Sequence, residues 1–300
     1  MTTTAVTATT NPLVVLWRFA RPHTIIGTAL SIVGLWTIAA AEGAAPPAYD
    51  LFFTLIAGFA VNIAIVGVNQ ITDVEIDRVN KPFLPIAAGD LSLGGAKAIV
   101  AVCCLLPLAL GLTQGWVETV AVAAGLAVGA VYSLPPLHLK RFPVAASLCI
   151  SGVRSVVVNL GVYWHFAGQI DPPVWALCLF VLPFSLAIAV LKDVPDLEGD
   201  RRFAIRTFTV RLGPEPVFRL GMTMLLVAYG GMILIAPVLL RDSAEPFVLA
   251  GGHAVAVVVL LRWAKAANPR YHTEFTRFYM RVWALFFLEY ILVPVACLAT

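Results

Sequence analysis

Charged residues are scarce in this chain: only 12% of its 300 residues are Asp, Glu, Lys or Arg. A soluble globular domain carries about twice that share. Hydrophobic residues make up 60% of the chain. This composition excludes an ordinary soluble fold and indicates a protein of the lipid bilayer, and we expect no nucleic-acid partner.

Several signatures of catalysis and cross-linking are also missing. The five cysteines lie within apolar stretches and show neither disulfide nor metal-ligand spacing, so we interpret them as small apolar side chains. There is no glycine-rich phosphate loop, no nucleophile elbow and no histidine pair at metal spacing. A mechanism that needs a nucleophilic side chain is therefore disfavoured.

Long apolar stretches fill most of the sequence. Each is long enough, or nearly so, to cross a hydrocarbon core of about 30 Å as a helix. The stretches cover residues 24–41, 51–71, 93–113, 117–134, 145–167, 173–191, 216–240, 246–264 and 278–298. We predict an all-α integral membrane bundle of nine transmembrane helices, with a single domain over residues 12–300. Residues 1–11 are expected to form a disordered tail, and residues 12–23 an interfacial segment.

Lysine and arginine residues predict the orientation of this bundle. In a nine-helix arrangement nearly all of them fall on one side, whereas only Arg241 falls on the other and Arg154 lies inside a span. The opposite loops, at 42–50, 114–116 and 168–172, are almost free of them. By the positive-inside rule the N-terminus is cytoplasmic.

Two acidic clusters emerge on that cytoplasmic side. The first contains Asn69, Asp73 and Asp77, and the second contains Asp193, Asp196 and Asp200. On a helix each set would line one face, where the carboxylates repel unless a cation holds them, and hard oxygen ligands suit Mg²⁺. Two alternatives remain: the first cluster is a solvated helix end, and in the second Asp193 or Asp196 opens a short helix with Pro195.

If the substrate is a diphosphate, two Mg²⁺ ions would not neutralise its negative charge together with that of four aspartates, so further cations are required. The candidates for diphosphate binding are Arg78, Lys81, Lys140, Arg141 and Arg206. Arg154 lies deep in a span, where a charge is a functional candidate by default, and Lys192 ends another span. The alternatives are positive-inside bias for the loop residues and a structural ion pair or carbonyl contact for Arg154.

A metal site with apolar walls is suited to ionising an allylic diphosphate. The metal stabilises the leaving diphosphate, and a dry pocket protects the carbocation from water. A transporter is the alternative from another class. Transporters usually place ionisable residues near the membrane midplane, however, and here they gather at one interface.

Longer strings around the acidic clusters resemble a known family. Asn69–Gly89 and Lys192–Gly213 are similar to the two signatures of the UbiA-type membrane prenyltransferases, and of the homogentisate phytyltransferases in particular. Trp17–Gly27 and Leu285–Tyr290 also fit that subfamily. One departure from the wider superfamily is Lys81, where an Arg-Pro pair is common.

The resemblance implies Mg²⁺-dependent transfer of a phytyl group from its diphosphate to homogentisate, with decarboxylation, in tocopherol synthesis. It implies metal and diphosphate contacts at Asn69, Asp73, Asp77, Asp196 and Asp200, with the four aspartates acting in catalysis. Arg154 is then the first candidate for the acceptor carboxylate and Lys192 the second.

The alternatives within this class are another acceptor, such as chlorophyllide or 4-hydroxybenzoate, or a longer prenyl donor. The N-terminal segment lacks the arginine-rich character of a transit peptide. We therefore expect a cyanobacterial enzyme of the plasma or thylakoid membrane.

Overall fold

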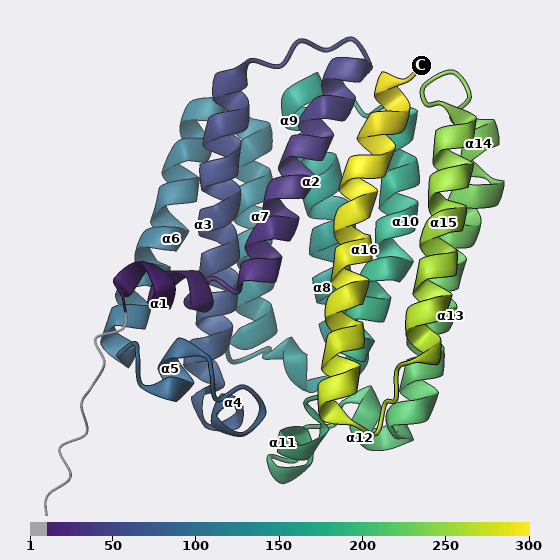
Figure 1. Cartoon of the computed structure of the whole chain (residues 1–300). Coiled ribbons are helices and arrows are strands. Elements are labelled where there is room, and N and C mark those ends of the chain that lie inside the picture. Colours follow the sequence, from purple (N-terminus) through teal and green to yellow (C-terminus); the bar gives the residue numbers. More distant parts are fainter. Residues whose placement is uncertain (1–10) are drawn as a thin grey trace, which may run out of the picture.

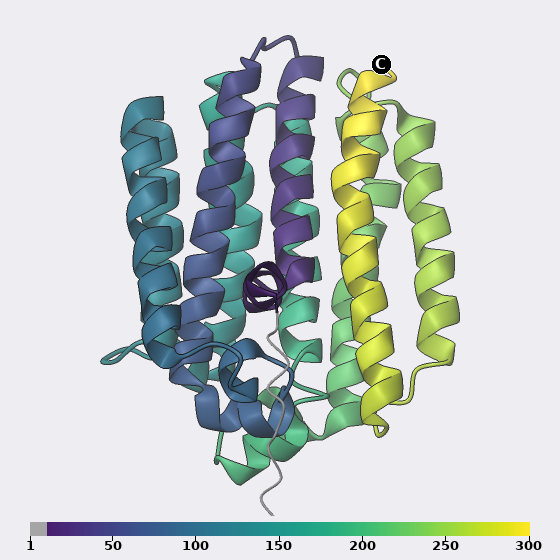
Figure 2. The ribbon, with the colours of Figure 1, turned by 60° about the vertical axis from the view of Figure 1, so that its left-hand side comes forward.

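The computed structural model describes residues 11–300 as an all-helical bundle (Figure 1). The tail predicted at residues 1–11 lies outside this part of the chain, apart from Asn11. Asn11 caps the short helix α1 (Pro12–Phe19), because its side chain accepts a hydrogen bond of 2.9 Å from the backbone N–H of Leu13. Figure 2 shows α1 end-on, lying across the long helices.

Nine membrane-length helices are present in residues 11–300, which confirms the predicted number. They are α2 (Pro22–Ala41), α3 (Ala48–Thr72), α6 (Leu93–Gln114), α7 (Trp116–Ser133), the continuous Pro143–Ala167, α10 (Pro172–Leu191), Pro214–Leu239, α15 (Pro246–Lys265) and α16 (His272–Leu298). The largest difference from the prediction is in α16, which begins six residues earlier than residue 278. Its first turns are polar and extend beyond the apolar stretch.

Two of these spans are composite. The fifth consists of α8 (Pro143–Gly152), a π-helical segment η2 (Val153–Val162) and α9 (Tyr163–Ala167). The seventh consists of α13 (Pro214–Leu234) and α14 (Ala236–Leu239). π-Helical turns are rare in proteins, and those that occur often lie at functional sites. The segment η2 carries Arg154, the charge predicted inside a span.

Helix α10 is the most deeply buried of the membrane-length helices in residues 11–300. Its sequence contains no charged residue, and most of its side chains are buried against α13, α16 and η2. A helix that is apolar on every face is expected in such a position. It ends at Leu191, directly before the second acidic cluster.

Short helices gather at one end of the bundle (Figure 1). They are α4 (Val74–Asn80), α5 (Pro85–Ala88), the 3₁₀ turn η1 (Leu139–Arg141), α11 (Leu197–Arg202) and α12 (Phe208–Leu212). Because α3 and α10 both end here, the segments that follow them meet, and α4 packs against α11. This end of the bundle therefore contains both acidic clusters.

Candidate active site

The first acidic cluster lies where α3 passes into α4. The helix breaks at Asp73, so the predicted continuous helical face is interrupted there. Backbone hydrogen bonds nevertheless cross the break, from Asp73 N to Asn69 O (3.0 Å) and from Asp77 N to Asp73 O (2.8 Å). Asn69 lines a cavity between the long helices, and Asp77 is buried.

The second cluster does not share one helix face, and that prediction is wrong. Pro195 has no N–H and its ring would clash with the carbonyl of Leu191, so α10 ends at Leu191 and a series of turns follows. Asp193 lies in these turns, whereas Asp196 and Asp200 flank the first turn of α11. The alternative, in which Asp196 opens a short helix, describes the backbone correctly.

The side chain of Asp196 makes no capping hydrogen bond and pairs instead with Lys81, the residue that follows α4. Lys140 of η1 forms a matching pair with Asp73, at 2.5 Å, and also donates to the hydroxyl of Thr72 at 2.8 Å. Each acidic segment is thus neutralised in part by a lysine from another segment of the chain.

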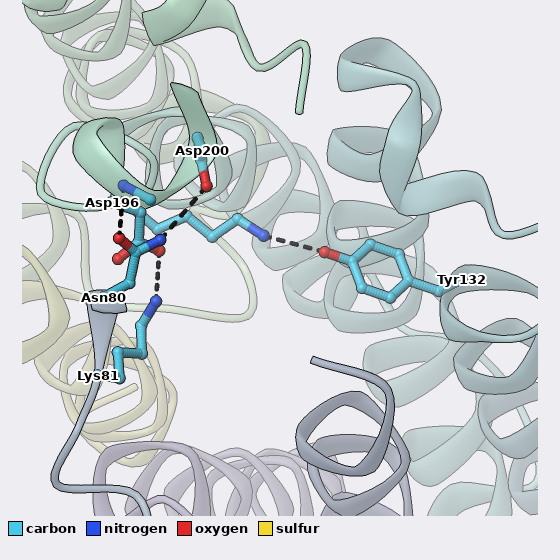
Figure 3. Close-up of polar contacts among 7 residues, drawn as sticks. Asn80, Lys81, Tyr132, Asp196 and Asp200 are labelled. Atoms are coloured by element: carbon cyan, nitrogen blue, oxygen red, sulfur yellow. Dashed lines mark hydrogen bonds and ion pairs between the residues drawn. The ribbon is translucent and has the colours of Figure 1, made fainter. Parts of the chain in front are cut away.

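Figure 3 shows how the two acidic segments meet. The Asn80 side chain donates to Asp200 Oδ1 at 3.4 Å, and its oxygen accepts a hydrogen bond of 3.0 Å from Gly199 N. Further into the bundle, Lys192 donates to the hydroxyl of Tyr132 at 3.0 Å.

Asp77 and Asp200 are the buried carboxyls of the two clusters, and neither forms an ion pair within residues 11–300. Each is only 5% exposed, and in each the Oδ2 atom is buried without a hydrogen-bond partner. Burial raises the pKa of Asp77 to about 6, although Arg21 and Lys81 oppose the shift. Burial raises the pKa of Asp200 to about 7, and the neighbouring carboxylates of Asp193 and Asp196 add to the shift.

These oxygens are suited to a hard divalent cation, since buried carboxylates require a positive partner. The protein alone does not complete such a site: in residues 11–300 no three His, Cys, Asp or Glu side chains converge as metal ligands. A cation bound here would need further oxygen atoms from a ligand.

A cavity begins beside the first cluster and extends between the long helices. Both predicted acceptor contacts, Arg154 and Lys192, line it. The Arg154 guanidinium lies 4.6 Å from the centre of the Trp283 ring, and its Nη1 is buried without a hydrogen-bond partner. Within the described residues Arg154 forms no ion pair, so the structural ion pair considered above is absent there.

Three of the five predicted diphosphate contacts form no ion pair with the acidic clusters within residues 11–300. Arg78 pairs with Glu75 at 2.7 Å, and both side chains are exposed. Arg141 and Arg206 are also exposed. Lys81 and Lys140 are the two that the structure brings to the acidic residues.

Sequence reasoning missed Asn80, Gly199 and Arg21. Arg21 lines the cavity, its Nε is buried without a partner, and its backbone has φ = 57°, a conformation rare for a residue with a side chain. The available signal was its position directly before Pro22, at the same end of the bundle as the acidic clusters.

Comparison with known proteins shows the family of this chain. Residues 30–287 match the UbiA prenyltransferase family. The chain belongs to this family. It is a multi-pass membrane protein, as the nine apolar helices among residues 11–300 indicate.

Two relatives and one solved structure illustrate the similarity. Homogentisate phytyltransferase of Synechocystis sp. is 41% identical over 292 residues, which are 93% of this chain and 94% of that protein. The chloroplastic homogentisate solanesyltransferase of Arabidopsis thaliana is 39% identical over 295 residues, 93% of this chain and 75% of that protein. A UbiA homolog from Archaeoglobus fulgidus, solved with GPP and Mg²⁺, shares the fold with a TM-score of 0.66 at 16% identity, over 94% and 99% of the two chains.

Proposed function

We propose that this protein transfers a phytyl group from phytyl diphosphate to homogentisate, with loss of the acceptor carboxyl as CO₂, as in tocopherol synthesis. The observation that carries the proposal is the buried Nη1 atom of Arg154, which has no hydrogen-bond partner in the described residues, in a cavity that Asn69 of the first acidic cluster also lines. The acidic segments would provide a site for the diphosphate, and Arg154 would provide a site for the carboxylate. The 41% identical relative, named a homogentisate phytyltransferase, supports the choice of substrates.

At the donor end we assign Mg²⁺ and diphosphate binding to Asp77 and Asp200, whose free oxygens are already buried. The remaining contacts of this site would come from Asn69, Asp73, Asp193 and Asp196. Mg²⁺, when bound, neutralises the diphosphate and stabilises it as a leaving group. Lys81 and Lys140 lie close enough to their aspartates to exchange a carboxylate for a phosphate oxygen, which would hold the diphosphate in place.

At the acceptor end Arg154 holds the carboxylate of homogentisate, and Lys192 is the second cation available. The C1–O bond of the donor breaks and its electron pair leaves with the diphosphate. The electron-rich hydroquinone ring then attacks the allylic cation, and apolar walls exclude water. The ring loses a proton, CO₂ leaves the acetate group, and the carbon left behind takes up a proton.

We further propose that residues 12–300 form one transmembrane domain with the N-terminus and the acidic segments on the cytoplasmic face. The support is the concentration of lysine and arginine at that end of the bundle. A cysteine at Ser243 should react with an impermeant thiol reagent from the non-cytoplasmic side, and a cysteine at Ser92 should not. The reverse pattern would contradict the orientation.

The substrate assignment is tested by assaying the purified protein with Mg²⁺ and a panel of donors and acceptors. Phytyl diphosphate with homogentisate should give the most product. A donor of nine isoprene units is the second candidate, because the Arabidopsis relative is named a solanesyltransferase. Transfer to chlorophyllide or 4-hydroxybenzoate, with none to homogentisate, would reject the acceptor and leave the prenyltransferase assignment intact.

A further inference from the structure

Asn62 of α3 lines the same cavity as Arg154, and the reaction described above does not use it. Its Nδ2 atom donates to the backbone oxygen of Ala20 at 3.2 Å and to Thr24 Oγ1 at 3.1 Å. An amide nitrogen carries two hydrogen atoms, so these two bonds use both of them and fix the orientation of the amide. The oxygen Oδ1 is left as a hydrogen-bond acceptor.

This oxygen is accessible. Within residues 11–300 it makes no hydrogen bond, and it is not among the side-chain atoms buried without a partner there. Asn62 belongs to the wall of the cavity and is half-buried. An accessible acceptor on a cavity wall bonds to water when no ligand is bound, and to a hydroxyl group when a ligand supplies one.

A short chain of contacts joins Asn62 to Arg154 around the wall of the cavity. Thr24, which accepts a hydrogen bond from Asn62, lies three residues before Gly27 on the same face of α2. A Cβ atom on Gly27 would lie 3.5 Å from Trp283 Cζ3, and the guanidinium of Arg154 lies 4.6 Å from the centre of the Trp283 ring. All five residues line the cavity.

Asn62 is set back from the acidic segments. It lies seven residues before Asn69 on α3, which is two helical turns and about 10 Å further into the bundle. Both side chains line the cavity, as expected for this spacing on one helix face. The spacing leaves room for the diphosphate at the acidic end and places a ligand of Asn62 beside the prenyl chain.

Hydroxyl groups of α2 also line this part of the cavity, at Thr24, Thr28 and Ser31. Each donates its hydrogen atom to a backbone carbonyl of the preceding turn, at 2.7–2.9 Å. The oxygen of Thr24 also accepts the bond from Asn62. Thr28 and Ser31 keep lone pairs that a ligand could use, so they are the competing acceptors in the test below.

We propose that Asn62 selects hydroxylated arenes by accepting a hydrogen bond from a ring hydroxyl of the acceptor, while Arg154 holds the acceptor carboxylate. The proposal rests on the acceptor site assigned above. An arene without that hydroxyl would displace water from Oδ1 and return no hydrogen bond, which is unfavourable. The selection suits the reaction, because a ring hydroxyl makes the arene electron-rich and able to attack the allylic cation.

The test measures binding of homogentisate and of phenylacetate, which lacks both hydroxyls, to the purified full-length protein with Mg²⁺ and an unreactive prenyl thiodiphosphate. The wild type should bind homogentisate about tenfold more tightly than phenylacetate, as expected when the analogue leaves one polar group unpaired. In Asn62→Ala the two affinities should differ by less than about threefold, because the acceptor oxygen is gone. If Asn62→Ala does not give a folded protein, Asn62→Leu must lose the preference instead, since it keeps the volume without an oxygen.

Two controls separate the oxygen of Asn62 from its structural contacts and from its neighbours. Thr24→Val removes one partner of the Asn62 amide but leaves Oδ1 in place, so it should keep the preference for homogentisate. Thr28→Val and Ser31→Ala remove the competing hydroxyls and should also keep it. The preference is a ratio of two affinities within one variant, so a general loss of binding does not change it.

Equal affinity of the wild type for the two arenes, or binding of neither, would overturn the proposal. An unchanged preference in the folded Asn62 variant would also overturn it, and its loss in Thr28→Val or Ser31→Ala would assign the hydroxyl to α2. Binding requires no transfer. A protein that shows the preference but forms no prenylated homogentisate would therefore reject the proposed function and support the role of Asn62, and a protein that prenylates homogentisate without the preference would do the reverse.

Discussion

The side-chain oxygen of Asn80 accepts a hydrogen bond of 3.0 Å from the backbone N–H of Gly199 (Figure 3). This contact joins the two acidic segments, because Asn80 ends α4 and Gly199 lies in α11. A Cβ atom on Gly199 would lie 2.2 Å from Asn80 Oδ1, so any other residue there would displace the amide. The separation of the two segments thus depends on a glycine.

Gly199→Ala should reduce donor affinity and turnover, because the clash moves α11 away from α4. Asn80→Ala should have a similar but smaller effect, with a loss of about 1–3 kcal/mol in folding stability for the unsatisfied polar groups. Thermal unfolding and donor KM measure the two effects. Gly94→Ala is the matched control, since its added Cβ would meet no atom within 4 Å. Equal behaviour of the two alanine variants at 199 and 94 would contradict this account.

The lysine pairs predict a division among the basic residues. Lys81→Ala and Lys140→Ala should each weaken donor binding by about 1.5–3 kcal/mol, the value for a lost hydrogen bond to a charged group. Arg78→Ala should change donor binding little, because Arg78 pairs with Glu75 on the exposed surface. Donor KM and binding of a thiodiphosphate analogue provide the comparison. A larger effect at Arg78 than at the lysines would reverse the assignment.

The buried carboxyls predict that folding stability depends on pH, and that stabilisation by Mg²⁺ depends on pH in the opposite direction. The pKa values of Asp77 and Asp200, about 6 and about 7, exceed the ordinary value of 3.8. The folded protein therefore binds these protons more tightly than the unfolded chain, and the metal-free protein should lose stability as the pH rises from about 4 to about 7.

Mg²⁺ competes with those protons, so it should raise the unfolding temperature more at about pH 8 than at about pH 5. Turnover should likewise fall as the pH drops below about 6–7, with a lower midpoint at higher Mg²⁺ concentration. Thermal unfolding across this range, with and without Mg²⁺, is the measurement. Stabilisation by Mg²⁺ that does not vary with pH would contradict the role of these two aspartates.

Arg154→Leu should weaken the use of homogentisate more than the binding of the donor. The KM for homogentisate should therefore rise by a larger factor than the Kd for a donor analogue. The variant removes the cation for the acceptor carboxylate but leaves the acidic segments untouched. Arg154→Lys should restore part of the activity relative to Arg154→Leu, because it keeps the charge but loses the guanidinium that lies over the Trp283 ring. Equal losses toward both substrates in Arg154→Leu would assign Arg154 to a general structural role.

Patterns within short stretches of sequence predicted those features of the fold that depend on neighbouring residues. Apolar length was sufficient to identify the nine membrane-length helices of residues 11–300. The spacing of carboxylates pointed to Asp77 and Asp200, and their role in metal binding stays a prediction. The break at Asp73 and the turns before α11 were harder to predict, because a helical register assumes a continuous helix. Pro195 was the residue that should have limited that assumption.

Contacts between distant segments could not be predicted from spacing. In the structure Oε2 of Glu289 on α16 lies 2.9 Å from Nε2 of His253 on the neighbouring helix α15, a residue 36 positions away in the chain. The pairing of Asn80 with Gly199 is similar, since the two are 119 residues apart and meet only because α4 packs on α11. Such contacts depend on how the helices are arranged.

The most direct test of the central claim follows the carboxyl carbon of the acceptor. Homogentisate labelled at the carboxyl should release one labelled CO₂ for each phytyl group transferred, only with Mg²⁺ present. Asp77→Asn and Asp200→Asn should abolish both the release and the transfer in folded protein, because both oxygens are assigned to the metal and diphosphate. Prenylated product that retains the label, or full activity in these two variants, would contradict the account.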